Sequence, residues 1–195
     1  MNPEKFRKYY IDTSIVFWKT TEKWGELSNM ASGFPLFIND YLIPSSEALY
    51  QACRFPDYPE IQKMVIGQSN AMYAKRVAQQ NESYTRKDWY QYRILIMKWC
   101  LRLKLLQHWS VFSRILLATK DLPIVEFSKT DTFWGACPMG KDILIGENVL
   151  GRLLMEIRER IKSNSELAGF KTPNIPNFKL FNAPIQETIL KNNKP

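Results

Sequence analysis

The strongest hydrophobic pattern in the chain predicts one long buried helix over residues 87–107. Large apolar side chains recur there at three- and four-residue steps, at Trp89, Tyr92, Ile96, Trp99, Leu103 and Leu106. This spacing places them on one face of an α-helix. A helix with so wide an apolar face belongs in a protein core, so we expect the rest of the chain to pack around it.

Shorter patterns predict the remaining elements. Pro44-Ser45-Ser46 is a helix-start signal, and Pro56 and Gly67 are helix-stop signals. Helices are expected over residues 46–55, 59–66, 71–79, 111–118 and 150–162. Short strands are expected over residues 15–18, 36–38 and 124–127, with a glycine-containing loop over residues 128–148 and extended chain from residue 163. Helices dominate beside a small sheet, which is typical of the α+β class.

Composition supports a single predominantly helical α+β domain. The chain has 195 residues, of which 45% are hydrophobic, enough for one real core. We expect residues 1–162 to form the domain and residues 163–195 to be a C-terminal extension packed on it. No apolar run approaches the roughly 20 residues of a membrane span, and the first residues lack the apolar core of a signal peptide. Three dispersed cysteines indicate neither a disulfide framework nor a metal site, so we expect a cytoplasmic protein with no membrane partner.

The positive charge is concentrated in one segment. The net charge is +8, and residues 75–120 hold ten Lys or Arg against Glu82 and Asp88. The rest of the chain is balanced, with 17 basic and 17 acidic residues. This bias favours an anionic partner such as a phosphate, a pyrophosphate or a nucleic acid. A solvated, solubilising helix face would give the same count.

Glu47 is the most unusual ionisable residue. It is the one charged residue between Asp40 and Arg54, among apolar and small neighbours. One interpretation places it in the first turn of a helix, where the helix dipole favours an anion. The other makes it a desolvated carboxyl group, whose pKa rises towards neutrality and suits proton transfer at physiological pH. A helix start can hold the side chain in place while a pocket uses it.

Few other residues offer chemistry. The single histidine, His108, stands at a helix end, where a structural role is the commoner one. The nucleophile, metal and phosphate-loop motifs are absent from the sequence, which leaves carboxylates and lysines. Asp131 precedes Trp134-Gly135 in the glycine-containing loop and either lines a pocket or closes a turn. Lys75 is either a Schiff-base nucleophile or a solvated helix residue.

Seven motifs in order resemble the NADAR (YbiA-like) family from about Ile15 to Lys162. They are Gly25-Glu-Leu-Ser-Asn29, Pro44-Ser-Ser-Glu-Ala-Leu-Tyr-Gln-Ala52, Ala74-Lys75, Arg86-Lys-Asp-Trp89, Val125-Glu-Phe-Ser128 with Asp131-Thr-Phe-Trp-Gly135, Gly146-Glu-Asn-Val-Leu-Gly151 and Leu154-Met-Glu-Ile-Arg158. The resemblance implies an α+β fold and an N-glycosidase that cleaves the bond between a ribose anomeric carbon and a nucleobase amine. It implies neither a cofactor nor a metal.

The resemblance also implies the site residues. The catalytic positions are Glu47, Asp131 and Lys75. The substrate-binding positions are Ser28, Asn29, Arg76, Trp89, Trp134, Gly135, Asn148 and Gly151. Two departures from the family pattern, the loop over residues 137–142 and Lys120 in place of a glycine, affect the substrate pocket more than the chemistry.

Two substrate classes are associated with the family. One is ADP-ribose attached to guanine in nucleic acid, which the basic segment favours here. The alternative is the phosphoribosylaminopyrimidine intermediates of riboflavin biosynthesis. A different class of function is a non-catalytic module that binds ADP-ribose or NAD-like ligands through the same aromatic residues. Within the enzyme class, either Glu47 acts on water directly, or Lys75 captures the ring-opened sugar as an imine.

Overall fold

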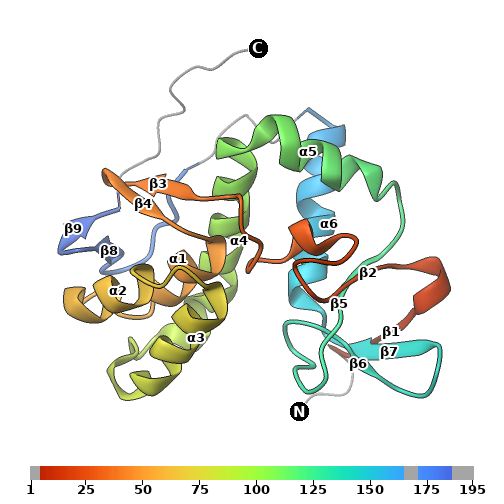
Figure 1. Ribbon diagram of the computed structural model, residues 1–195, viewed down its shortest axis with the longest axis horizontal. Coiled ribbons are helices and arrows are strands. Elements are labelled where there is room, and N and C mark those ends of the chain that lie inside the picture. The colour runs from red at the N-terminus through yellow and green to blue at the C-terminus, as the bar shows by residue number, and fades with distance from the viewer. Residues whose placement is uncertain (1–4, 165–170, 186–195) are drawn as a thin grey trace. The chain divides into compact units, whose positions relative to one another are not determined.

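The computed structural model describes residues 5–164 and 171–185. The chain forms two compact units, each made of two chain segments (Figure 1). The first unit comprises Met1–Ser28 and Ser110–Ala168, and the second comprises Asn29–Trp109 and Gly169–Pro195. Within the described residues, no helix is both long and apolar enough to cross a membrane.

The first unit contains two small sheets. In the first sheet, β7 (Ile143–Gly146) lies between β1 (Arg7–Tyr10) and β6 (Cys137–Pro138), and both pairings are antiparallel. The second sheet pairs β2 (Ile15–Phe17) with β5 (Ile124–Glu126) in parallel. A 3-10 turn, η2 (Ile11–Thr13), lies between β1 and β2, and a second, η3 (Gly25–Leu27), precedes Ser28. Helix α5 (Trp109–Ala118) leads towards β5, and α6 (Val149–Lys162) packs against β5.

Asn148 and Gly151 join the start of α6 to strand β5. The Asn148 amide is fully buried, donates to the Ile124 carbonyl at 2.8 Å and accepts from the Glu126 backbone N–H at 3.1 Å. A Cβ atom at Gly151 would lie 2.1 Å from the Ile124 carbonyl oxygen, so only glycine fits there without a shift of backbone. Both residues therefore hold this unit together, because they satisfy or approach the backbone of β5.

The second unit is a group of helices. Helix α1 (Ser46–Ala52) contacts α2 (Pro59–Ile66), α3 (Ala71–Gln80) and the long α4 (Trp89–Gln107), as Figure 1 shows. A 3-10 turn, η4 (Glu82–Tyr84), connects α3 to α4. The hairpin of β3 (Leu36–Ile38) and β4 (Tyr41–Ile43) precedes α1. The buried residues of α4 include Ile96, Trp99 and Leu103, which agrees with the predicted core helix.

The segment over residues 171–185 packs on the second unit. It contains the short hairpin β8 (Lys179–Leu180) and β9 (Ala183–Pro184). The rings of Phe178 and Trp99 lie 5.1 Å apart. The buried Gln62 donates to the Lys179 carbonyl at 3.0 Å and accepts from the Phe181 backbone N–H at 2.7 Å. Residues 165–170 and 186–195 of the expected extension lie outside the described residues.

The structure confirms the α+β class and most of the expected helices. Helix α2 has the predicted bounds, α4 begins two residues later than expected, and α1 ends at Ala52, before the expected residue 55. The loop predicted over residues 128–148 was wrong, because it contains β6 and β7. Strands β1 and β4 were also missed. The single domain over residues 1–162 stays a prediction.

Candidate active site

Glu47 lies at the start of α1 and is buried. The side chain of Ser45 accepts from the Ala48 backbone N–H at 3.1 Å and caps the helix, which places Glu47 in the first turn. The residue is only 5% exposed, and its Oε1 accepts from Gln51 Nε2 at 2.8 Å. Both interpretations of the sequence therefore describe the same residue, since the helix start positions a carboxyl group that is withdrawn from solvent.

Burial raises the pKa of Glu47 above its ordinary value of 4.5. The positive charge of Lys75 on α3 opposes this rise, as do the Gln51 hydrogen bond and the charge of Arg54. Desolvation is the largest of these effects, so the protonated form is favoured over a wider pH range than in an exposed glutamate. The result is a carboxyl group that holds its proton to a higher pH than an exposed glutamate does.

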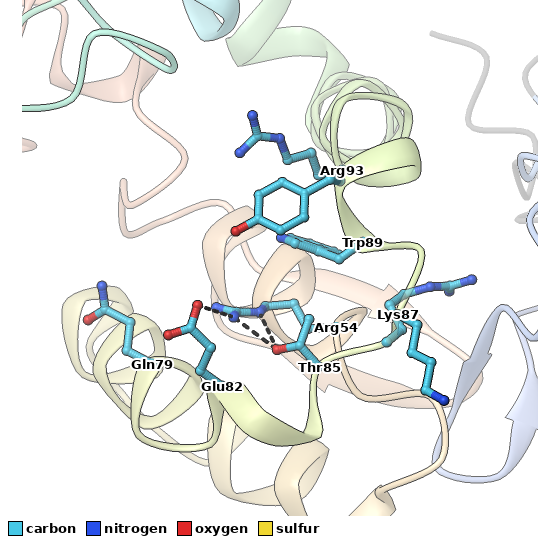
Figure 2. Close-up of a pocket in the computed structure, with 9 residues that line it drawn as sticks. Arg54, Gln79, Glu82, Thr85, Lys87, Trp89 and Arg93 are labelled. Carbon is cyan, nitrogen blue, oxygen red and sulfur yellow. Dashed lines mark hydrogen bonds and ion pairs between the residues drawn. The ribbon is translucent and has the colours of Figure 1, made fainter. Parts of the chain in front are cut away.

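A hydrogen-bonded series leads from Glu47 to Arg54 and beyond. Gln51 Oε1 accepts from Arg54 Nη1 at 3.1 Å. Arg54 Nε and Nη2 both donate to Thr85 Oγ1, at 3.2 and 2.9 Å, and the Arg54 guanidinium lies 4.0 Å from the Glu82 carboxylate (Figure 2). Because Gln51 is held at both ends of its amide, it fixes the orientation of the Glu47 carboxyl group.

Arg54 faces a basic cavity of about 360 Å³. The lining residues come from the turn after α1, from α3, from η4 and the segment that follows it, and from α4. They are Arg54, Gln79, Glu82, Thr85, Arg86, Lys87, Trp89, Tyr90 and Arg93. Four of these side chains are cationic and one is a carboxylate. Figure 2 shows Arg54 between Glu82 and Trp89. Such a lining suits a ligand that combines negative charge with a ring.

Trp89 forms the aromatic part of this cavity. Its ring centroid lies 4.9 Å from that of Tyr50, and the Arg54 guanidinium lies 5.5 Å from its ring. Arg86, by contrast, is largely engaged with the Asp88 carboxylate and with the Pro176 carbonyl at 2.7 Å. The hydrogen bond that Arg86 donates to the Asp88 carboxylate lowers the pKa of Asp88. Glu47 does not line the cavity and is connected to it through Gln51 and Arg54.

Buried polar atoms next to Glu47 lack protein partners. The Asn29 carbonyl accepts from the Glu47 backbone N–H at 3.1 Å, which places Asn29 beside the start of α1. Among the described residues, neither Asn29 Oδ1 nor Ser46 Oγ has a hydrogen-bond partner, and both atoms are buried. Buried polar atoms are normally satisfied, so these two are candidates to bind water or substrate hydroxyl groups.

The predicted residues of the first unit form a second set. Asp131 Oδ1 accepts from the backbone N–H groups of Phe133 and Trp134, both at 2.9 Å, which is the turn-closing role considered for this residue. Trp134 is half-buried, with its ring 5.0 Å from Phe133. A Cβ atom at Gly135 would lie 2.5 Å from the Glu126 carbonyl oxygen, so this glycine permits a close backbone approach.

The predicted site residues thus fall into two sets, one on each unit. The second unit holds Glu47, Lys75, Asn29, Arg76 and Trp89, and the first unit holds Ser28, Asp131, Trp134, Gly135, Asn148 and Gly151. Within the second unit, Glu47 is hydrogen-bonded through its backbone N–H to the Asn29 carbonyl, and the charge of Lys75 lowers the pKa of its carboxyl group. His108 is placed away from this chemistry, since its Nε2 lies 2.7 Å from the Pro35 carbonyl oxygen and its ring packs edge-on against Phe34.

Comparison with known proteins gives the family. The model of the NADAR domain matches residues 16–162, about three quarters of the chain. The chain belongs to the NADAR domain family. It is 34% identical over 150 residues to N-glycosidase YbiA of Escherichia coli (strain K12), covering 77% of this chain and 89% of that protein. N-glycosidase Npun_R5314 of Nostoc punctiforme is 31% identical over 158 residues, which cover 80% of this chain and 97% of that protein.

Two further matches extend this result. Riboflavin biosynthesis protein VVA0006 of Vibrio vulnificus is 33% identical over 161 residues, which cover 82% of this NADAR chain but only 41% of that longer protein. The NMR structure of Escherichia coli YbiA matches with a TM-score of 0.67 and 32% identity, covering 83% of this chain and 91% of that chain. The NADAR fold expected from the sequence is therefore confirmed.

Sequence reasoning missed the residues that support Glu47 in this NADAR domain. Gln51 follows Glu47 by four residues, which is the spacing of side-chain neighbours on a helix, so this partner was readable from the sequence. Arg54 follows Gln51 by three residues, which is also a spacing at which side chains on a helix meet. Thr85 and Glu82 are distant in sequence, and only the packing of η4 near α1 brings them to Arg54.

Replacing Glu47 with Gln should stabilise the protein at neutral pH. Below pH 4.5 the carboxyl group is protonated in both states and carries no penalty. As the pH rises further, the unfolded chain releases its proton while the folded protein retains it, so the free energy of unfolding falls until the raised pKa is passed. Each unit of the rise in pKa corresponds to about 1.4 kcal/mol. Glu47→Gln removes this loss and keeps the acceptor for Gln51.

Thermal unfolding at about pH 7 and about pH 4 measures this effect. We expect Glu47→Gln to unfold at a higher temperature than the parent protein at the higher pH, with the difference shrinking at the lower pH. Glu60→Gln is the matched control, because that side chain is 78% exposed and should change little. A Glu47→Gln protein that is less stable near neutral pH would show that the ionised carboxylate contributes to stability through Lys75.

Proposed function

We propose that this NADAR protein is an N-glycosidase that removes ADP-ribose from ADP-ribosylated guanine in nucleic acid. Membership in the NADAR family, with N-glycosidases among relatives matched over most of their length, makes the chain a hydrolase of N-glycosyl bonds. The bond that we assign joins the ribose anomeric carbon to the nucleobase amine. The guanine adduct is the finer part of the proposal and rests on the chemistry of the site.

The observation that carries the proposal is the buried Glu47 with its raised pKa. Cleavage of an N-ribosidic bond passes through an oxocarbenium-like state, and its leaving group is an amine that must be protonated as it departs. A buried carboxyl group with a raised pKa can supply this proton and afterwards take one from water. Lys75, whose charge acts on Glu47, helps set how readily that proton is given up.

The basic cavity supports a pyrophosphate-bearing substrate. Arg54 lines it together with the ring of Trp89, and the lining as a whole holds four cationic side chains and one carboxylate. Arginine side chains offer forked donors that match phosphate oxygens, and an aromatic ring offers a stacking face for a base. An ADP-ribose group carries two phosphates and an adenine, so it uses more of this lining than a substrate with one phosphate does.

The first unit carries predicted site residues of its own. One oxygen of Asp131 closes a turn, and its second oxygen can accept from water or face developing positive charge on the ribose. Half-buried Trp134 offers a stacking surface next to it. Asn29 Oδ1 and Ser46 Oγ on the second unit are the candidate partners for ribose hydroxyl groups. Asn148 and Gly151 hold α6 on β5 within the first unit.

A second candidate substrate comes from the names of relatives. The Vibrio vulnificus protein and the chloroplastic PYRR protein of Zea mays are both named riboflavin biosynthesis proteins. A phosphoribosylaminopyrimidine has the same bond between ribose and amine, with one phosphate on the ribose side. Glu47 would perform the same proton transfer on it, and the cationic cavity would hold a single phosphate.

Parallel assays of the two substrates test this proposal. We expect release of ADP-ribose from an oligonucleotide that carries ADP-ribosylated guanine, with little turnover of the phosphoribosylaminopyrimidine. Loss of general acid catalysis should lower kcat of Glu47→Gln by about 100-fold or more, while Glu60→Gln stays fully active. Turnover of the aminopyrimidine alone would make it the substrate, and ligand binding without any turnover would indicate a binding module.

Borohydride trapping separates the two catalytic routes. If Lys75 attacks the anomeric carbon of the ring-opened sugar, its Nζ–C1 bond forms as the base leaves with a proton, and the resulting imine is reducible to a stable amine. Direct hydrolysis leaves no adduct. Because Glu47 can act on water by itself, we expect intact-mass spectrometry to show no trapped sugar. An adduct that disappears in Lys75→Ala and persists in the exposed Lys63→Ala control would instead establish the covalent route.

A further inference from the structure

Two exposed tyrosines on the second unit are each paired with an arginine. Tyr90 on α4 is 74% exposed, and the Arg93 guanidinium lies 5.0 Å from its ring centroid. Tyr73 on α3 is 51% exposed, with the Arg76 guanidinium 5.5 Å from its ring centroid. In both pairs the arginine follows the tyrosine by three residues, one helical turn away.

Both pairs adjoin the basic cavity. Tyr90 and Arg93 are themselves among its lining residues. On the other helix, Gln79 lines the cavity, and Arg76 lies one turn before Gln79 on α3. Tyr73 lies one further turn away. The cavity around Trp89 is therefore flanked by an aromatic and cationic pair on α3 and by a second pair on α4.

We propose that these two pairs, with Lys87, bind the single-stranded polynucleotide on either side of the modified base. This inference rests on the proposed function and adds the surface that recognises the strand. An exposed tyrosine ring stacks on any base, and an arginine against that ring adds positive charge next to the adjacent phosphate. A solubilising helix face needs charge alone, and it gains nothing from large exposed rings beside each arginine.

The geometry favours a single strand over a duplex. In a duplex the base faces are stacked on one another, so a protein tyrosine cannot reach them without unstacking. In a single strand the bases are free to stack on Tyr73 and Tyr90 while the modified nucleotide enters the cavity between them. The same arrangement binds with little dependence on base sequence, because every base has a π face.

Binding of unmodified oligonucleotides tests this inference independently of catalysis. Fluorescence anisotropy would follow a labelled single strand of about 12 nucleotides and the matching duplex. We expect the single strand to bind more tightly. The double variant Tyr73→Ala with Tyr90→Ala should raise its Kd at least tenfold, since two stacking contacts are lost. The double variant with Phe at both positions keeps the rings and should bind nearly as the parent does.

Two controls separate stacking from charge and from misfolding. Tyr10→Ala removes a tyrosine that is 55% exposed on β1 of the first unit and should leave the Kd unchanged. Lys87→Ala should reduce the dependence of log K on log salt concentration by about 0.7, the value for one phosphate contact on a single strand. Circular dichroism of every variant confirms that the fold is kept.

The inference is overturned if the Ala and Phe double variants bind alike, if duplex and single strand bind equally, or if no oligonucleotide binds at low salt. Displacement of the strand by poly-glutamate at equal charge concentration would likewise overturn it in favour of an acidic protein partner. A protein that binds the strand through both tyrosines but hydrolyses no ADP-ribosylated guanine would leave this surface standing and reject the proposed function. A protein that hydrolyses ADP-ribosylated guanine but binds the strand equally well without both tyrosines would support the proposed function and reject this surface.

Discussion

The chemistry proposed for this NADAR protein depends on the burial of one carboxyl group. Glu47 would be a stabilising anion at the start of α1 if it were solvated. Packing against α3 and α4 removes the solvent, and the pKa rises because desolvation outweighs the opposing charge of Lys75. Gln51 then fixes the group in one orientation. Burial lowers the stability of the protein above pH 4.5, and under the proposed function it provides a proton donor for the leaving amine.

Arg54 connects this group with the basic cavity. Its guanidinium reaches Gln51 on one side and Thr85 on the other, while its face lies near the ring of Trp89. An anion bound in the cavity would therefore influence the pKa of Glu47 through Arg54 and the side-chain amide of Gln51. Because that anion neutralises part of the positive charge, it favours the protonated carboxyl group when substrate is present.

The sequence predicted the helices, and the position of Glu47 in the first turn of one of them, better than it predicted the sheets. Long apolar periodicity identified α4, and proline and glycine identified the bounds of α2, because these signals are local. Strands β1 and β7 pair across more than one hundred residues, and each is only four residues long. The hydrogen bonds of Asn148 to β5 depend on tertiary contacts that no local pattern shows, and its role in substrate binding stays a prediction. The contact between Gln51 and Glu47, by contrast, could have been predicted from their four-residue spacing on a helix.

The most direct measurement of the central claim is the titration of Glu47 itself. Carbon-13 NMR of the side-chain carboxyl groups, assigned by comparison with Glu47→Gln, gives its pKa in the folded protein. We predict a midpoint above the ordinary 4.5, and a further rise in Lys75→Ala, because the opposing positive charge is then gone. A midpoint at or below 4.5, unchanged by Lys75→Ala, would contradict the assignment of Glu47 as the proton donor.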